Sequence, residues 1–198
     1  NAEGKKTRVG YCKEIGILLV VLCHTMSPVM KNSEIMTTLY RFVYTFHMPL
    51  FFFLAGIVAP LGKTDKWGQT KSKIERLMIS YFVWAIIYWP LKIVFVDLAR
   101  NNTRIPWWSL LLGNNPDGEL WFLYVLFVLS LVTIWVVNEK TEKILLVIAL
   151  ILTFFSPLYP AKYAFPGISL SFSCYQVFLC AGCLLRKDKD KSIGGLSV

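Results

Sequence analysis

The chain alternates between long apolar runs and short polar stretches. Six apolar segments stand out, and they run from Glu14 to Met30, Leu39 to Leu61, Leu77 to Leu98, Leu120 to Asn138, Ile144 to Leu158 and Gly167 to Leu185. Proline, glycine and charged residues fill the gaps between them. Apolar runs of about twenty residues are typical of membrane-spanning helices. The pattern therefore predicts an all-α fold, a polytopic membrane helix bundle of about six transmembrane helices.

The distribution of basic residues predicts how these helices are oriented. Lysine and arginine concentrate in the N-terminal tail, the second and fourth connections and the C-terminal tail, which alternate onto one side of a six-helix bundle. In membrane proteins the cytoplasmic segments carry this excess. We therefore expect a multi-pass protein of the cell membrane with both termini cytoplasmic, and a single membrane domain over residues 1–198.

Composition narrows the class of protein further. Hydrophobic residues make up 56% of the chain, aromatic residues 15%, and the formal net charge is +9. This charge fits membrane topology and anionic lipid rather than nucleic acid, because no basic run is interleaved with stacking aromatics. The five cysteines are odd in number and mostly lie in apolar runs. We expect packing thiols, with no disulfide framework and no metal site.

Two ionisable residues of the first segment are candidates for chemistry. Lys13 and His24 are separated by ten residues, which places them about 16 Å apart along a helix and near one of its faces. Ionisable groups inside a spanning helix are costly, so they indicate a functional site. The structural alternative is that Lys13 extends to the membrane interface while His24 bonds a neighbouring helix.

Helix depth places two further candidates near His24. His47 lies about two turns inside the second segment, and Glu119 stands at the outer end of the fourth. With the predicted topology, these three residues share a similar depth on three helices. An imidazole can take a proton near pH 7, and a carboxylate can orient it or stabilise its charged form. We therefore expect His24, His47 and Glu119 to form a buried acid/base site.

A cluster of cations is expected at the cytoplasmic end of the bundle. Lys13 lies at the foot of the first helix, and Lys73 and Arg76 lie at the foot of the third. Because Lys73 and Arg76 are three residues apart, they share a helix face. Cations in this position can bind the phosphates of an anionic cofactor. Basic residues at cytoplasmic helix ends are also ordinary topology signals.

These stretches together resemble acyltransferase family three, the integral-membrane acyltransferases of the O-acetylating type. The family's basic residue, ten-residue gap and histidine match Lys13 and His24. Its basic pair at the third helix, usually Arg-x-x-Arg, matches Lys73 and Arg76 with lysine in the first position. The strings FFFLAG in the second segment and LWFLYVLF in the fourth resemble two further family signatures. The longer string FHMPLFFFLAG is most similar to the sugar O-acetylase branch, which includes fucose-acetylase-like members.

The resemblance implies an O-acyltransferase that moves an acetyl group from cytoplasmic acetyl-CoA to a hydroxyl of a cell-surface carbohydrate. Its implied partners are the lipid bilayer, acetyl-CoA as acyl donor, and a carbohydrate or glycolipid acceptor. The family usually has more spanning helices than this chain offers, so the resemblance also implies the N-terminal part of a larger domain. The implied roles are cofactor binding by Lys13, Lys73 and Arg76, base catalysis or transient acyl transfer by His24, and orientation by His47 and Glu119.

A proton-coupled transporter or permease fragment is the alternative function. Buried histidines and acids also serve proton relays in membranes. Two short or broken segments in corresponding positions would favour a transporter, and the sequence has no such internal symmetry.

Overall fold

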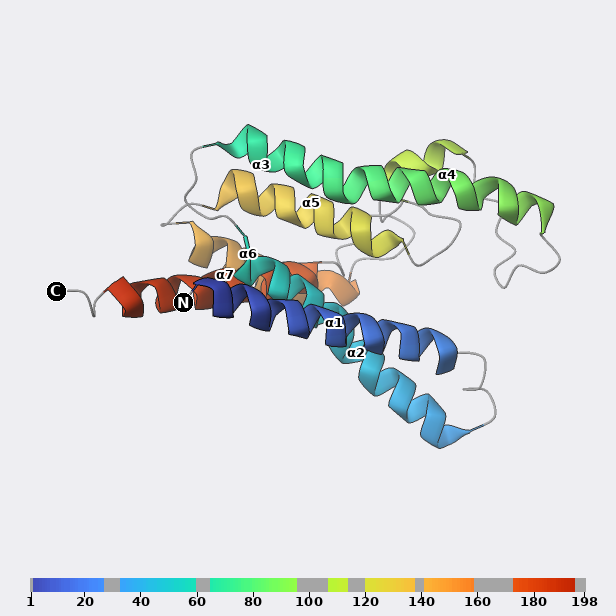
Figure 1. Cartoon of the computed structure of the whole chain (residues 1–198), viewed down its shortest axis with the longest axis horizontal. Helices are drawn as coiled ribbons and strands as arrows, with labels where there is room; N and C mark the ends of the chain where they lie inside the picture. The colour runs from blue at the N-terminus through green and yellow to red at the C-terminus, as the bar shows by residue number, and fades with distance from the viewer. Residues whose placement is uncertain are drawn as a thin grey trace. The chain divides into compact units, whose positions relative to one another are not determined.

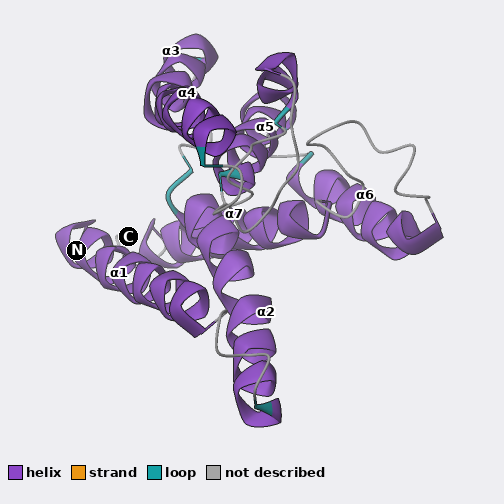
Figure 2. Ribbon diagram, turned by 90° about the vertical axis from the view of Figure 1, so that its right-hand side faces the viewer, coloured by secondary structure: helices purple, strands orange, loops and turns teal. Residues whose placement is uncertain are grey.

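The computed structural model describes residues 2–26, 33–59, 65–95, 107–113, 120–137, 141–158 and 173–194. All regular secondary structure in these residues is helical, as Figure 2 shows. Helices lie in each of the six apolar segments, namely α1 (Ala2–Met26), α2 (Glu34–Ile57), α4 (Ile79–Val94), α5 (Trp121–Val136), α6 (Glu142–Phe155) and α7 (Ser173–Gly194). The prediction of an all-α protein is thereby confirmed. Over the residues described, none of the helices combines the length and the apolar character that crossing a membrane requires.

The chain divides into two compact units. One unit comprises residues 1–59 and 175–198, and the other comprises residues 60–174. The first contains α1, α2 and nearly all of α7, whereas the second contains the described helices between them. The single membrane domain expected over residues 1–198 stays a prediction.

In the first unit, α1 and α2 pack against each other as an antiparallel pair (Figure 1). Ser33 caps the N-terminus of α2, where its side chain accepts a hydrogen bond from the amide of Met36 at 3.5 Å. The helix then continues through Pro49 to Ile57. Gly16 of α1 is buried against α2, because a Cβ atom there would lie 2.9 Å from the ring of Phe51.

Two glycines allow α2 and α7 to approach closely at the C-terminal end of α2 (Figure 2). A Cβ atom on Gly56 would collide with the carbonyl oxygen of Leu179, and one on Gly182 would collide with the backbone of α2. Next to this crossing, the ring of Phe52 stacks on that of Tyr175 with centroids 4.6 Å apart. The missing side chains of Gly56 and Gly182 are therefore what lets the two helix backbones approach.

In the second unit, a continuous helical rod runs through α3 (Lys66–Lys73), the π-helical turn η2 (Ile74–Met78) and α4, with α5 alongside (Figure 1). The third apolar segment begins at Leu77, so the helix begins about three turns before the apolar run. The cause is local, because the carboxylate of Asp65 accepts a 2.7 Å hydrogen bond from the amide of Gly68 and caps the helix. Packing of α3 and η2 on α5 stabilises the extension.

Two tyrosines hold the 3₁₀ helix η3 (Trp107–Leu112) in the second unit. The hydroxyl of Tyr81 donates to the carbonyl of Leu110 at 2.9 Å, and that of Tyr124 donates to the carbonyl of Leu111 at 3.4 Å. Gly113 ends η3 with a φ of 82°, a conformation that favours glycine, and a Cβ there would meet the Tyr124 ring. A second 3₁₀ turn, η4 (Ser156–Leu158), follows α6 directly.

Candidate functional site

The two histidine-bearing helices meet along their lengths. The ring of Phe51 in α2 covers Gly16 in α1. His24 follows Gly16 by about 12 Å along α1, and His47 precedes Phe51 by about 6 Å along α2. Because the helices are antiparallel, both histidines are displaced from the Gly16–Phe51 contact toward the same end of the pair. Their backbones are therefore separated by about 6 Å along the helix axes. The side chain of His24 lies outside the described part of the chain.

His47 is a buried imidazole with a fixed ring. Its side chain is 1% exposed, and its Nδ1 atom lies 2.8 Å from the carbonyl oxygen of Val43 one turn earlier. The edge of the ring meets Tyr44 with centroids 5.3 Å apart. A carbonyl oxygen only accepts, so Nδ1 carries the proton and Nε2 holds the lone pair of the neutral ring. This arrangement suits an acid/base group, because the partner of one ring nitrogen decides which tautomer is present.

Lys73 and Arg76 lie where the α-helical winding changes to π-helical winding. Lys73 is the last residue of α3 and is half-buried, whereas Arg76 lies within η2 and is exposed. The amide of Ile79 donates to the carbonyl of Ile74, which is the five-residue spacing of a π-turn. One π-turn holds more residues than an α-turn, so a step of three residues falls further short of a full turn. Lys73 and Arg76 therefore share a helix face less closely than in an α-helix. Single π-turns within α-helices occur frequently at functional sites.

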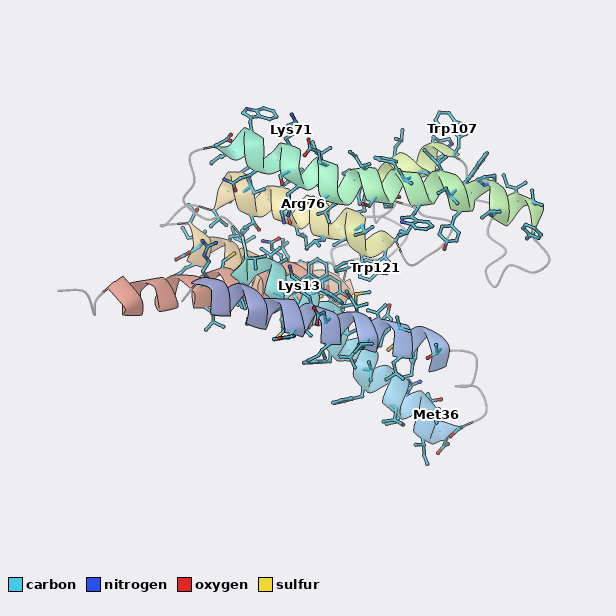
Figure 3. The ribbon with its side chains drawn as sticks, viewed as in Figure 1. Lys13, Met36, Lys71, Arg76, Trp107 and Trp121 are labelled. Atoms are coloured by element: carbon cyan, nitrogen blue, oxygen red, sulfur yellow. The ribbon has the colours of Figure 1, made fainter. Side chains whose placement is uncertain are left out.

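The third predicted phosphate ligand, Lys13, lies in the other unit. It is exposed on α1, three residues before Gly16, and Figure 3 labels it. The structure therefore brings Lys73 and Arg76 into one short helical stretch. The cluster of all three cations stays a prediction.

The predicted carboxylate Glu119 lies outside the described residues. The aromatic stretch that follows it is described, and α5 begins at Trp121, which Figure 3 labels. Trp121 is half-buried, and Tyr124 one turn later supports η3 as described above. The stretch is therefore in part a packing element that holds the neighbouring 3₁₀ helix.

Sequence reasoning did not single out two contacts that position these helices. Tyr81 is 0% exposed and bonds η3 across 29 residues of sequence. Lys66 donates from Nζ to the carbonyl oxygen of Trp135 at 3.2 Å, which joins the start of α3 to the last turn of α5. A tyrosine within an apolar run was a visible signal for the first contact, since a buried hydroxyl needs a partner. The second depends on the tertiary pairing of α3 with α5.

Residues 8–196 of the chain match the acyltransferase domain of acyltransferase family 3. The nodulation protein NolL of Mesorhizobium japonicum is 24% identical to this chain over 180 residues, which cover 82% of this chain and 46% of that protein. The chain thus spans about half the length of this relative. No solved structure matches the chain. Because the family match extends over nearly its whole length, the chain belongs to acyltransferase family 3.

Proposed function

We propose that the chain moves an acetyl group from cytoplasmic acetyl-CoA to a hydroxyl of a cell-surface carbohydrate or glycolipid. The observation that carries this proposal is the acyltransferase family match over residues 8–196. The basic and histidine positions of the family resemblance, Lys13, His24, Lys73 and Arg76, all fall within the matched range. The relative that the chain matches is about twice as long, so the activity proposed is that of the whole domain.

The bilayer is the proposed surrounding of the helices. Large apolar side chains point outward on several helices, including Leu18 at 68% exposed, Phe42 at 72%, Ile86 at 64% and Phe154 at 77%. Extended apolar surfaces of this kind are unusual in soluble monomers and are normal where acyl chains replace water. They support lipid around the helices, and the alternation of lysine- and arginine-rich segments along the sequence supports a cytoplasmic location for both termini.

Donor binding is assigned to the cations of α1 and the rod. Lys73 and Arg76 lie within one stretch of helix, and the exposed guanidinium of Arg76 is suited to hold a phosphate through two parallel hydrogen bonds. Lys13 supplies a third positive charge from α1. A distance of about 16 Å along α1 separates Lys13 from His24, which is comparable with an extended pantetheine arm. The phosphates and the reacting thioester would therefore lie at different depths.

Acetyl transfer itself requires a base and exclusion of water. In the proposed reaction, His24 takes the proton of the acceptor hydroxyl as that oxygen bonds to the thioester carbonyl carbon. The carbon–sulfur bond then breaks, and the departing sulfur takes a proton to leave free CoA. His24 can instead carry the acetyl group transiently as an acyl-imidazole. His47 and Glu119 orient the acceptor or tune His24, and a low-dielectric path limits hydrolysis of the thioester.

Acetyl-CoA binding by the purified protein in lipid nanodiscs tests the donor assignment. We expect wild-type protein to bind acetyl-CoA, and we expect Lys13→Ala and Arg76→Ala to weaken binding by about tenfold each, as for a lost charge-assisted bond. Lys143→Ala is the matched control, because Lys143 is an exposed lysine of α6 outside the motif. Equal effects of all three substitutions would show general charge attraction and would contradict the assignment.

Transfer of labelled acetyl groups to a cell-surface polysaccharide fraction tests the reaction. We expect His24→Ala to abolish transfer while the protein remains inserted in the membrane and still binds acetyl-CoA. Full transfer by this variant would remove His24 from the mechanism. Substrate-driven proton flux without acetyl-CoA binding would identify a transporter and overturn the enzymatic proposal.

A further inference from the structure

The ends of α3 and α5 form a small cluster of one lysine and two tryptophans. The ammonium of Lys66 donates to the carbonyl oxygen of Trp135 at 3.2 Å and lies 5.8 Å from the centre of the Trp135 ring. The ring of Trp67 meets that of Trp135 edge to face, with centroids 5.4 Å apart and planes at 84°. All three residues belong to the second unit. We call Lys66, Trp67 and Trp135 the lysine–tryptophan cluster.

The cluster is fixed in position and yet faces outward. Trp67 is 73% exposed and Trp135 is 44% exposed, although both rings pack on each other. Two large indoles would normally be buried in a protein core, whereas amphipathic rings at the headgroup level are a feature of membrane interfaces. Trp135 lies in the last turn of α5, which is where an interfacial residue of a spanning helix is expected. The surroundings that suit this cluster are therefore part apolar and part polar.

The charge of the cluster selects an anionic partner. An ammonium has three donors, and the carbonyl of Trp135 takes one of them. The nearest acid in sequence, Asp65, uses its carboxylate to cap the amide of Gly68. Lys71, labelled in Figure 3, is exposed and follows Trp67 by four residues, so it adds positive charge to the same face of α3. A phosphate with an attached acyl region complements both the cations and the indoles.

We infer that the lysine–tryptophan cluster binds the headgroup of an anionic glycerophospholipid and fixes the ends of α3 and α5 at the membrane surface. The inference rests on the membrane setting of the proposed function. The phosphate binds Lys66, with Lys71 adding positive charge on the Trp67 side of α3, while the glycerol and upper acyl region lies against the indoles of Trp67 and Trp135. Lys73 lies about 10 Å and Arg76 about 15 Å beyond Lys66 along the rod. The bound lipid therefore sets the depth of the proposed donor site.

Lipid retention in nanodiscs tests this inference. Protein is reconstituted with phosphatidylcholine containing phosphatidylglycerol, and the bound phosphatidylglycerol is counted by native mass spectrometry. We expect Lys66→Met to weaken phosphatidylglycerol binding about fivefold, which corresponds to the roughly 1 kcal/mol of one lysine near an anionic surface. Trp67→Ala weakens it as well, and Lys66→Arg restores it. Lys143→Ala and Trp107→Ala, which alter an exposed lysine and an exposed tryptophan elsewhere in the same unit, leave it unchanged.

The opposite results overturn the inference in distinguishable ways. Equal loss in the Lys66→Met and Lys143→Ala variants shows non-specific attraction between charges. Competition of acetyl-CoA with phosphatidylglycerol, or loss of acetyl-CoA binding in Lys66→Met with lipid retention unchanged, assigns the cluster to the donor instead. If wild-type protein binds no acetyl-CoA but still retains phosphatidylglycerol in a manner that depends on Lys66, the proposed enzymatic function fails and the lipid site stands.

Discussion

The Nδ1 atom of His47 donates a hydrogen bond to the carbonyl oxygen of Val43, 2.8 Å away and one turn earlier in α2. The bond holds the ring in one orientation and leaves Nε2 as the basic atom of the neutral form. Because the side chain is buried, proton transfer at Nε2 would occur away from bulk water. His47 therefore meets two requirements of an acid/base group, a fixed ring through local helix geometry and burial through packing.

Substitution of His47 by asparagine separates the structural role from the chemical one. The amide of asparagine reproduces the donor to Val43, but it has no basic nitrogen in place of Nε2. We expect His47→Asn to keep the melting temperature near that of wild type and to lower the rate of acetyl transfer by about 10²- to 10⁴-fold, the usual contribution of an acid/base group. Acetyl-transfer assays measure the rate, and thermal unfolding measures the melting temperature. Wild-type rates in His47→Asn would assign this residue to packing.

The crossing of α2 and α7 depends on two glycines. A methyl group on Gly56 or Gly182 would strike the backbone of the opposite helix, and relief of such overpacking costs about 1–3 kcal/mol. We expect Gly56→Ala and Gly182→Ala to lower thermal stability in detergent. Gly10→Ala is the matched control, because nothing lies within 4 Å of its Cβ position in α1. That substitution is expected to stabilise the helix by up to about 1 kcal/mol, so loss of stability there would contradict this account.

The two tyrosines that hold η3 should differ in their contribution to stability. Tyr81 is fully buried and its hydrogen bond to Leu110 is 2.9 Å long, whereas the bond from Tyr124 to Leu111 is 3.4 Å long and exposed. We expect Tyr81→Phe to lower the free energy of unfolding by about 1 kcal/mol and Tyr124→Phe to lower it less. Hydrogen exchange of the amides of residues 110–113 should accelerate more in the first variant. The reverse order would mean that η3 is held by contacts other than these hydroxyls.

Lysine at position 73 departs from the family's usual Arg-x-x-Arg, and this difference is testable. A guanidinium can bind phosphate through two parallel bonds, while an ammonium acts as a point charge. We expect Lys73→Arg to tighten acetyl-CoA binding by about two- to fivefold in calorimetric titrations of reconstituted protein. Lys71→Arg, two residues earlier on the same helix, should have no effect. A similar gain in both variants would indicate that residue 73 is not a specific phosphate ligand.

The helices could be predicted from sequence because their signal is local. Apolar runs separated by proline, glycine and charge located six helical segments, and each contains a helix. The third apolar segment does not mark the start of its helix, because the charged stretch before Leu77 is helical as well. Its cap was nevertheless visible as Asp65 three residues before Gly68. What the sequence did not display was the packing on α5 that stabilises a polar helix of this composition.

For the candidate site, too, local spacing could be identified in the sequence and contacts between helices could not. The motif positions of Lys73 and Arg76 could be identified from their spacing, and the bond from His47 to Val43 follows from the one-turn periodicity of a helix. The π-turn that contains Arg76 could not be identified, since no residue type or spacing in Ile74–Met78 encodes it. The contacts of Tyr81 with Leu110 and of Lys66 with Trp135 join residues far apart in sequence. They arise only when the helices pair.

The π-turn sets how far α3 is rotated about the helix axis relative to α4. Each residue of an α-helix advances by about 100° around the axis, so the extra residue accommodated in Ile74–Met78 offsets everything before it by about that angle relative to α4. The basic surface of α3 and the apolar surface of α4 can therefore face different directions around the axis of one unbroken helix. Deleting one residue from this turn would rotate Lys66 and Trp67 away from Trp135 by more than a quarter turn, although the sequence of α4 would be unaltered.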